Sequence, residues 1–337
     1  MAQARKRITS HDVARRAGVS QATVSYVLSG RRSGQLRVSE DTCQRVVAAA
    51  QELGYVPNQT ARSLRRQRTE RVCLMLSRVG VPSYDQLVTD VQCCADQYGY
   101  TVIIAVSNSP EREQHVIQQV RRGIADGLLI PYHIEPAYVA QIAATGLPVV
   151  VMSNQIMPNG FDVVRTTEAL ACDEAMRYLI AKGHRRIAFL DHRPNIDTPY
   201  ARYESYTRML QANDIPLDPE LVRVGAEQRE ASYRSTCDLL ALPERPTAIF
   251  ASSDIGAISA INAIQAARLR VPEDIAVIGV GNIPEGAAMR PRLTTVGQEP
   301  LDFGAVAQLL FDRIQADGVI EDRELVLPWR LIVRKSV

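Results

Sequence analysis

The stretch ITSHDVARRAGVSQATVSYVL, residues 8–28, decides the fold of the first part of the chain. Thr9 is a residue type that caps helix N-termini, and Asp12 is placed three positions later, where the helix dipole favours an acid. Gly18 supplies the left-handed residue that commonly ends a helix. We therefore expect a short helix from about residue 10 to residue 17, followed by a tight turn.

A second short helix is predicted directly after that turn. Ser20 can cap it, and residues 21–29 carry Val24, Val27 and Leu28 at spacings of three and four, as in a helix with one buried face. Two short helices joined by a glycine-containing turn form a helix-turn-helix. The start of this motif's second helix reads base edges in the major groove of DNA.

Each residue type at the start of the second helix suits one kind of DNA contact. Gln21 can pair bidentately with adenine, and Ala22 can touch a thymine methyl. Thr23 and Ser25 suit phosphate oxygens. The predicted DNA contacts of the head are Thr9, Ser20, Gln21, Ala22, Thr23, Ser25 and Tyr26.

A third helix should run from its cap at Ser39 to residue 53, closed by Gly54. Its apolar face is predicted from the spacing of Cys43, Val46, Val47 and Ala50. The connection before it, residues 31–37, holds three arginines, and two interpretations stay open for it: extra phosphate contacts or a solvated loop.

Charge is distributed unevenly along the chain. The first 68 residues contain 13 Lys and Arg against four Asp and Glu, a net charge of +9, whereas the remainder carries −7. A basic head on an acidic body is typical of nucleic-acid binding. By charge alone, a merely solvated basic segment is the alternative.

From residue 71 onward, apolar runs alternate with helical segments. Continuous Val- and Ile-rich runs indicate parallel strands buried on both faces, and strand–helix alternation indicates a doubly wound α/β fold. Because there are too many such units for one small sheet, we expect two lobes. The expected strands are 72–76, 101–106, 127–130, 148–152, 187–190, 222–224, 248–251 and 275–280.

Beyond these patterns, the sequence resembles the LacI/GalR family of bacterial transcriptional regulators. The resemblance rests on residues 8–28 and 52–64, and continues through 183–190, 271–279 and 291–296. It implies an N-terminal helix-turn-helix head with a hinge helix, and a core of two parallel-sheet lobes like periplasmic sugar-binding proteins. It also implies a dimer on a palindromic operator and, in most members, repression.

The expected domains are a DNA-binding head at 1–56, a hinge at 57–70 and an effector-binding and dimerisation core at 71–337, with its lobes divided near 153–165 and 285–300. The short hinge helix should be ordered by DNA, because isolated short helices are marginal in water. By resemblance, the hinge residues that contact DNA are Asn58, Ala61, Arg62 and Leu64.

A small-molecule effector is implied between the lobes. By resemblance, Tyr84 stacks on it and Arg202 grips hydroxyls or a carboxylate, for which its fork of donors is suited. Each assignment has an alternative. Tyr84 could instead pack against the lobe wall, and Arg202 could be a surface helix residue. Asp254 could be only a helix cap. The predicted ligand-binding residues are Ser83, Tyr84, Ser153, Arg202, Ser253, Asp254, Asn282 and Gln298.

The sequence departs from the sugar-binding members at three positions. Ser153 and Gly281 stand where those members usually have Asp, and Ser253 where they usually have Asn. Carboxylates accept hydrogen bonds from sugar hydroxyls, so the losses weaken the prediction of a sugar. Two hypotheses remain: a regulator with an effector, a sugar or another metabolite, and one whose core only dimerises.

Other classes are not supported. The sequence contains no glycine-rich phosphate loop, nucleophile elbow or histidine constellation, so an enzyme is not expected. The six cysteines lack C-x-x-C spacing, and we expect no metal and no cofactor. With no apolar run long enough to span a membrane and no signal peptide, a cytoplasmic protein is expected.

Overall fold

The computed structural model describes residues 8–28, 38–56, 68–132, 134–191, 201–224, 229–318 and 320–337. It divides into two compact units, Met1–Thr69 and Glu70–Val337, here called the head and the core. The predicted hinge contacts Asn58, Ala61, Arg62 and Leu64 lie outside the described residues, as does the arginine-rich connection at 31–37.

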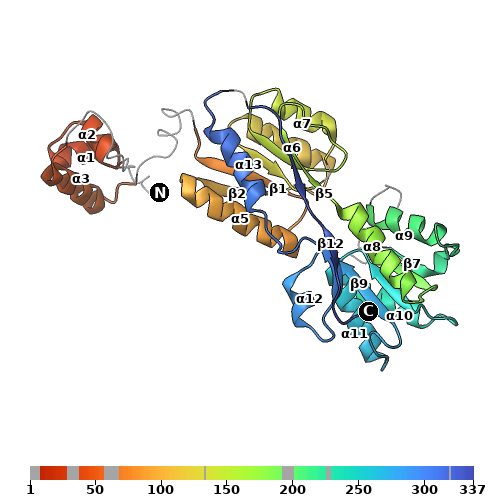
Figure 1. Ribbon diagram of the computed structural model, residues 1–337. Coiled ribbons are helices and arrows are strands. Elements are labelled where there is room, and N and C mark those ends of the chain that lie inside the picture. Colours follow the sequence, from red (N-terminus) through yellow and green to blue (C-terminus); the bar gives the residue numbers. More distant parts are fainter. Residues whose placement is uncertain are drawn as a thin grey trace. The chain divides into compact units, whose positions relative to one another are not determined.

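Within its described residues, the head is a bundle of three helices, α1 (Ser10–Ala17), α2 (Gln21–Leu28) and α3 (Glu40–Leu53) (Figure 1). The predicted start of α1 is confirmed as a capping box: Thr9 Oγ1 accepts from Asp12 N at 3.4 Å, and Asp12 Oδ2 accepts from Thr9 N at 3.0 Å. Gly18 ends α1 with a φ of 66°, as the left-handed position requires. The core of the bundle comprises Val13, Ala14, Ala17, Val24, Val46, Ala49 and Ala50.

One prediction about α3 is wrong. Val47 was expected on the buried face, but 40% of it is exposed, and Ala49 is buried instead. The buried stripe runs through Val46, Ala49, Ala50 and half-buried Leu53, which is the i, i+3, i+4, i+7 pattern. Val47 lies one residue, about 100° of helix rotation, from Val46, and so turns away from it.

The core contains two six-stranded sheets, which confirms the predicted architecture of two lobes. In lobe 1 the strand order is β11-β5-β4-β3-β1-β2, all parallel. In lobe 2 it is β12-β10-β9-β8-β6-β7, parallel except that β12 runs antiparallel to β10. The strands of lobe 1 are β1 (Arg71–Leu76), β2 (Thr101–Val106), β3 (Leu128–Ile130), β4 (Val149–Met152), β5 (Asp162–Thr166) and β11 (Glu324–Leu327), and those of lobe 2 are β6 (Ile187–Leu190), β7 (Val222–Arg223), β8 (Ala248–Ala251), β9 (Ala276–Val280), β10 (Thr294–Gly297) and β12 (Arg330–Ile332).

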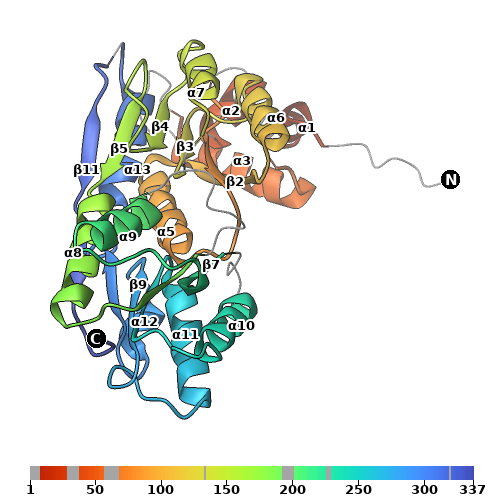
Figure 2. The ribbon, with the colours of Figure 1, turned by 90° about the vertical axis from the view of Figure 1, so that its right-hand side faces the viewer.

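Helices cover both faces of each sheet (Figures 1 and 2). Successive side chains of a strand point to opposite faces, so on β1 Leu74 packs with one helical layer and Met75 with the other. In lobe 1, α5 (Pro82–Tyr98) and α13 (Gly304–Gln315) form one layer, and α6 (Pro110–Arg121) and α7 (Pro136–Ala143) form the other. In lobe 2, α8 (Glu168–Ala181) and α9 (Ala201–Gln211) lie opposite α10 (Arg229–Leu240) and α11 (Asp254–Ala266), and the two short helices are η1 (Pro219–Leu221) and α12 (Pro284–Ala288).

The chain passes between the lobes three times: between β5 and α8, between β10 and α13, and between β11 and β12. The first and third passages are tied together at Thr167. Its Oγ1 donates to the carbonyl of Trp329 at 3.0 Å and accepts from Trp329 N at 2.7 Å. Thr167 N also donates to the carbonyl of Leu327 at 3.3 Å, which extends the β5–β11 ladder into the connection.

Candidate DNA-reading head and interlobe site

The start of α2 presents an exposed surface on the head. Gln21 and Ala22 are exposed, Ser25 and Tyr26 are half-buried, and Val24 is buried in the bundle. Gln21 Nε2 donates to Ser10 Oγ at 2.7 Å, so the first residues of α1 and α2 are joined by side chains. The predicted base-reading residues are therefore held on one helix end whose position is fixed by the packing of Val24.

Two of the predicted DNA contacts, Thr9 and Ser20, also serve as helix caps. Thr9 caps α1, and Ser20 Oγ accepts from Thr23 N at 3.1 Å and lies 2.9 Å from Thr23 Oγ1. These bonds satisfy backbone N–H groups that a helix start leaves without partners. Contact with DNA by Thr9, Ser20 or Thr23 stays a prediction, as it does for the exposed residues of α2.

In lobe 1, hydroxyl groups gather where the strands end. Ser77 follows β1, Ser107 follows β2 and Tyr132 lies just beyond β3. β1 sits between β2 and β3, which is where the strand order reverses and where open parallel sheets bind ligands. Ser83 lies beside Tyr84 in the first turn of α5, and the hydroxyl of Tyr84 lies 3.2 Å from Ser77 Oγ.

Tyr84 links lobe 1 to the opposite lobe electrostatically. Burial raises the pKa of Tyr84, while the Ser77 hydroxyl and the positive charges of Arg78 and Arg202 act to lower it. Arg202 belongs to lobe 2, so this electrostatic influence on Tyr84 acts across the lobes. Burial also raises the pKa of Tyr132, with the Ser107 hydroxyl acting in the opposite direction.

In lobe 2 the corresponding strand ends carry charge. Arg202, in the first turn of α9, donates from Nε to Glu168 Oε1 at 2.5 Å and from Nη1 to the carbonyl of Ser252. The two side chains of this ion pair are only 19% and 18% exposed. Ser252 follows β8 and donates to Asp191, a fully buried residue that follows β6. These positions again flank the reversal of strand order, here between β6 and β8.

Asp254 is almost completely buried and is used inside the lobe. Its Oδ2 accepts from Ile283 N at 2.8 Å, and its Oδ1 accepts from Thr295 Oγ1 at 2.5 Å. Burial raises the pKa of Asp254 to about 6, against these two hydrogen bonds. The cap of α11 is the neighbouring Ser253, whose Oγ accepts from Gly256 N at 3.1 Å.

The remaining predicted ligand residues also make internal contacts. Ser153 Oγ accepts from the backbone N–H groups of the two residues Gln155 and Ile156. Asn282 donates to the carbonyl of Gln298 and accepts from Arg334. Gln298 Nε2 donates to the carbonyl of Asp302, but its Oε1 is enclosed and has no hydrogen-bond partner among the described residues.

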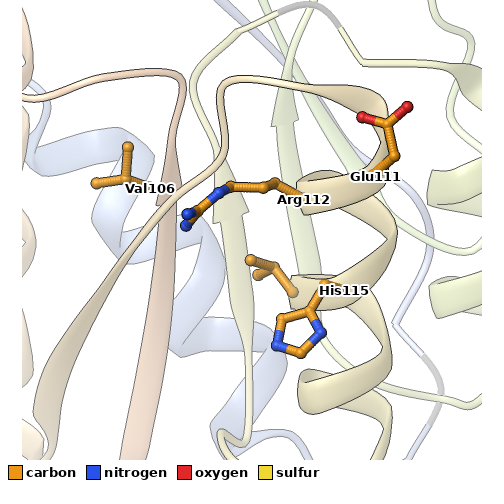
Figure 3. Close-up of a pocket in the computed structure, with 5 residues that line it drawn as sticks. Val106, Glu111, Arg112 and His115 are labelled. Carbon is orange, nitrogen blue, oxygen red and sulfur yellow. The ribbon is translucent and has the colours of Figure 1, made fainter.

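A surface hollow of about 320 Å³ lies on lobe 1, between the end of β2 and the start of α6. Arg112 extends from α6 toward Val106 on β2, and Glu111 points the other way (Figure 3). His115 and Val116 complete the lining. The hollow is open and its charged side chains are exposed, so we assign it no role.

The described residues contain no group of three or more His, Cys, Asp or Glu placed to hold a metal ion. Within the same part of the chain, no helix combines the length and apolar character that crossing a membrane requires.

A helix-turn-helix on a two-lobed parallel-sheet core defines a class of DNA-binding regulators, and comparison with known proteins specifies which. Residues 9–58 match the family model of bacterial regulatory proteins of the lacI family, and residues 176–337 match that of the periplasmic binding protein-like domain. The HTH-type transcriptional repressor PurR of Histophilus somni (strain 2336) is 30% identical over 333 residues, 98% of each chain. The HTH-type transcriptional repressor CytR of Escherichia coli (strain K12) is 30% identical over 331 residues, covering 97% of this chain and 96% of CytR.

Among solved structures, the lac repressor dimer bound to operator and the anti-inducer ONPF aligns with a TM-score of 0.77 and 27% identity, over 98% of this chain and 99% of that one. The chain belongs to the LacI family of bacterial regulatory proteins. Both PurR and CytR are named as transcriptional repressors.

Glu168, Asp191, Ser107 and Tyr132 were not identified from the sequence. Asp191, Ser107 and Tyr132 follow strands that were predicted, so counting one or two residues past each strand could have found them. Glu168 gave no such signal, because it follows β5, a strand that was not predicted.

Proposed function

We propose that this protein is a transcriptional repressor that binds a palindromic operator as a homodimer and is controlled by a small-molecule effector at the interlobe site. The proposed DNA binding rests on the helix-turn-helix. Its helices are capped, and Gln21 and Ala22 are exposed at the start of the second helix. The repressor names of PurR and CytR, and the operator-bound lac repressor, support the same role.

Selection of bound DNA from a random pool tests base reading. Gln21→Ala should lose preference at one or two operator positions, by about 1–3 kcal/mol each, because a bidentate contact to a base is lost. Gln44→Ala removes an exposed glutamine from α3 and serves as the matched control. If Gln21→Ala weakens binding to all sequences equally, Gln21 contacts only the DNA backbone.

The dimer is supported by the free edge of the lobe 1 sheet. β2 is an edge strand of apolar sequence, TVIIAV, and Ile104 on it is 46% exposed. A long apolar edge strand is a template for pairing with another chain, and a second copy is the occupant that the operator-bound lac repressor dimer supports. We propose that a second copy covers this edge.

Analytical ultracentrifugation of the full chain tests this surface. Ile104→Lys should shift the protein from dimer toward monomer, because it places a charge in the covered edge. Val326→Lys is the matched control, since Val326 is exposed on β11, the opposite edge strand of the same sheet. Equal dimer content in both variants and the parent would place the interface elsewhere.

A second candidate is a repressor whose core dimerises without binding an effector. It is favoured by the internal hydrogen bonds of Ser153, Ser253, Asp254 and Asn282, which use the polar groups that a ligand would need. Thermal shift with a metabolite panel separates the two, because a ligand that binds only the folded protein must raise its stability. A panel without any shift favours this second candidate.

A further inference from the structure

The charged groups of lobe 2 are arranged around a single arginine of the interlobe site. Arg202 directs Nε to Glu168 and Nη1 to the carbonyl of Ser252. Its positive charge also acts on Asp254. The protein thus supplies its own carboxylate to the guanidinium that would otherwise receive an anionic ligand.

The position of Glu168 makes this pairing specific. Glu168 is the first residue of α8, directly after Thr167, which is fixed to Trp329 by two hydrogen bonds. Arg202 comes from α9, 34 residues later, and meets Glu168 because α8 and α9 pack side by side (Figure 2). Both side chains are largely shielded from water, where a paired charge is costly to separate from its partner.

The other buried polar groups of the site include hydroxyls, such as those of Ser107 and Tyr132, and two hydrogen-bond acceptors. Asp191 is fully buried at the end of β6. Gln298 Oε1 is enclosed at the end of β10 without a hydrogen-bond partner among the described residues. A bound ligand satisfies such groups by donating hydrogen bonds, as hydroxyl and N–H groups do.

Resting on the proposed effector function, we infer that Glu168 determines specificity: it holds Arg202 so that the interlobe site takes uncharged ligands that donate hydrogen bonds and rejects carboxylates and phosphates. An anionic ligand would have to displace Glu168 from Arg202. It would then lie beside an unpaired carboxylate of the same charge, which is unfavourable in a shielded site.

The experiment compares uncharged probes with their anionic counterparts on the full-length protein. The pairs are glucose and glucuronate, ribose and ribose 5-phosphate, and adenosine and its 5′-monophosphate, with inorganic phosphate as a simple anion. Binding is measured by calorimetry and by thermal shift. The variants are Glu168→Gln, which keeps the shape and removes the charge, and Glu204→Gln, which removes the charge of an exposed glutamate from the first turn of α9.

The parent should bind uncharged members in preference to their anionic partners. In Glu168→Gln the affinity ratio of anionic to uncharged members should rise at least tenfold, and inorganic phosphate should stabilise this variant more than the parent. Glu204→Gln should behave as the parent. A merely structural role for Glu168 would change the unfolding midpoint without changing the ratio.

Three results would overturn the inference while leaving effector binding intact: an anionic probe preferred by the parent, an unchanged ratio in Glu168→Gln, or an equal rise in Glu204→Gln. If Glu168→Gln does not fold, the inference is tested by the parent alone, which should bind uncharged probes in preference to their anionic partners. If no probe of either charge binds any of the three proteins, the effector part of the proposed function fails, and this inference fails with it.

Discussion

Asp162 in lobe 1 and Asp254 in lobe 2 are both almost completely buried, yet their pKa values move in opposite directions. Burial raises the pKa of each carboxyl group. At Asp162, hydrogen bonds and charge from Arg313 and Arg323 outweigh burial and leave the pKa below its usual value. At Asp254 the two direct partners, Ile283 N and Thr295 Oγ1, are neutral, and burial prevails.

The difference shows that the pKa of a buried aspartate depends on the charge of its direct partners as well as on burial. Asp162 begins β5 and binds α13 and the approach to β11 through two guanidinium groups, so it fastens lobe 1 as an ion. Asp254 begins α11 and fastens lobe 2 through neutral donors.

The largest expected effect follows from removing Asp162. Asp162→Ala should lower the free energy of unfolding by about 3–5 kcal/mol, because Arg313 and Arg323 both lose a fully buried partner. Urea unfolding followed by the fluorescence of the chain's single tryptophan, Trp329, measures it. Asp322→Ala, which removes a partly exposed partner of Arg313, is the control and should cost less. A loss below about 1 kcal/mol would contradict the ionic role of Asp162.

The next effect is a pH dependence caused by Asp254. Because its pKa is raised from 3.8 to about 6, the folded state retains a proton that the unfolded state releases, so stability falls as pH rises from about 4 to about 6 and then levels off. The full effect is about 3 kcal/mol. Asp254→Asn should lack this component while keeping the amide oxygen as an acceptor.

Urea unfolding of the parent and Asp254→Asn across pH 4–7 isolates this component, since all other groups are shared. The difference in free energy between the two proteins should change with pH in the stated direction. A difference that stays constant across the range would show that Asp254 titrates normally in the folded protein.

The smallest expected effect concerns an ion pair nearer the surface of lobe 2. Arg186 and Asp218 are 2.7 Å apart, with side chains 27% and 30% exposed. Asp218→Ala should cost no more than about 1 kcal/mol, because water screens and replaces such a pair. A loss of unfolding free energy as large as that of Asp162→Ala would contradict the expectation that a partly exposed aspartate contributes less than a buried one.

The sequence predicted the parts of the fold that depend on neighbouring residues. Thr9 with Asp12, and Gly18, define the ends of α1 locally, and the continuous apolar runs of β2, β6 and β8 were predicted with their bounds. Strands β5, β10, β11 and β12 were missed. β5 and β10 contain polar residues such as Asp162 and Thr294, whose partners come from elsewhere in the chain.

The interlobe site was predicted in part for the same reason. Arg202 was identified by resemblance, but its pairing with Glu168 is a contact between two helices that sequence spacing does not reveal. Likewise, Asp254 was named as a ligand residue, whereas its two oxygens accept from residues 29 and 41 positions away. Local sequence patterns identify candidate residues and helix ends, while tertiary packing decides which polar groups already have hydrogen-bond partners within the protein.

The bonds between Thr167 and Trp329 have a mechanical consequence. Two of the three passages between the lobes run hydrogen-bonded to each other, so they bend together as one ribbon. A sliding motion of one passage along the other would break these bonds, whereas a swing of the lobes about the ribbon keeps them. The connection therefore favours hinge motion over shear, with Trp329 on the bonded ribbon about which the lobes would swing.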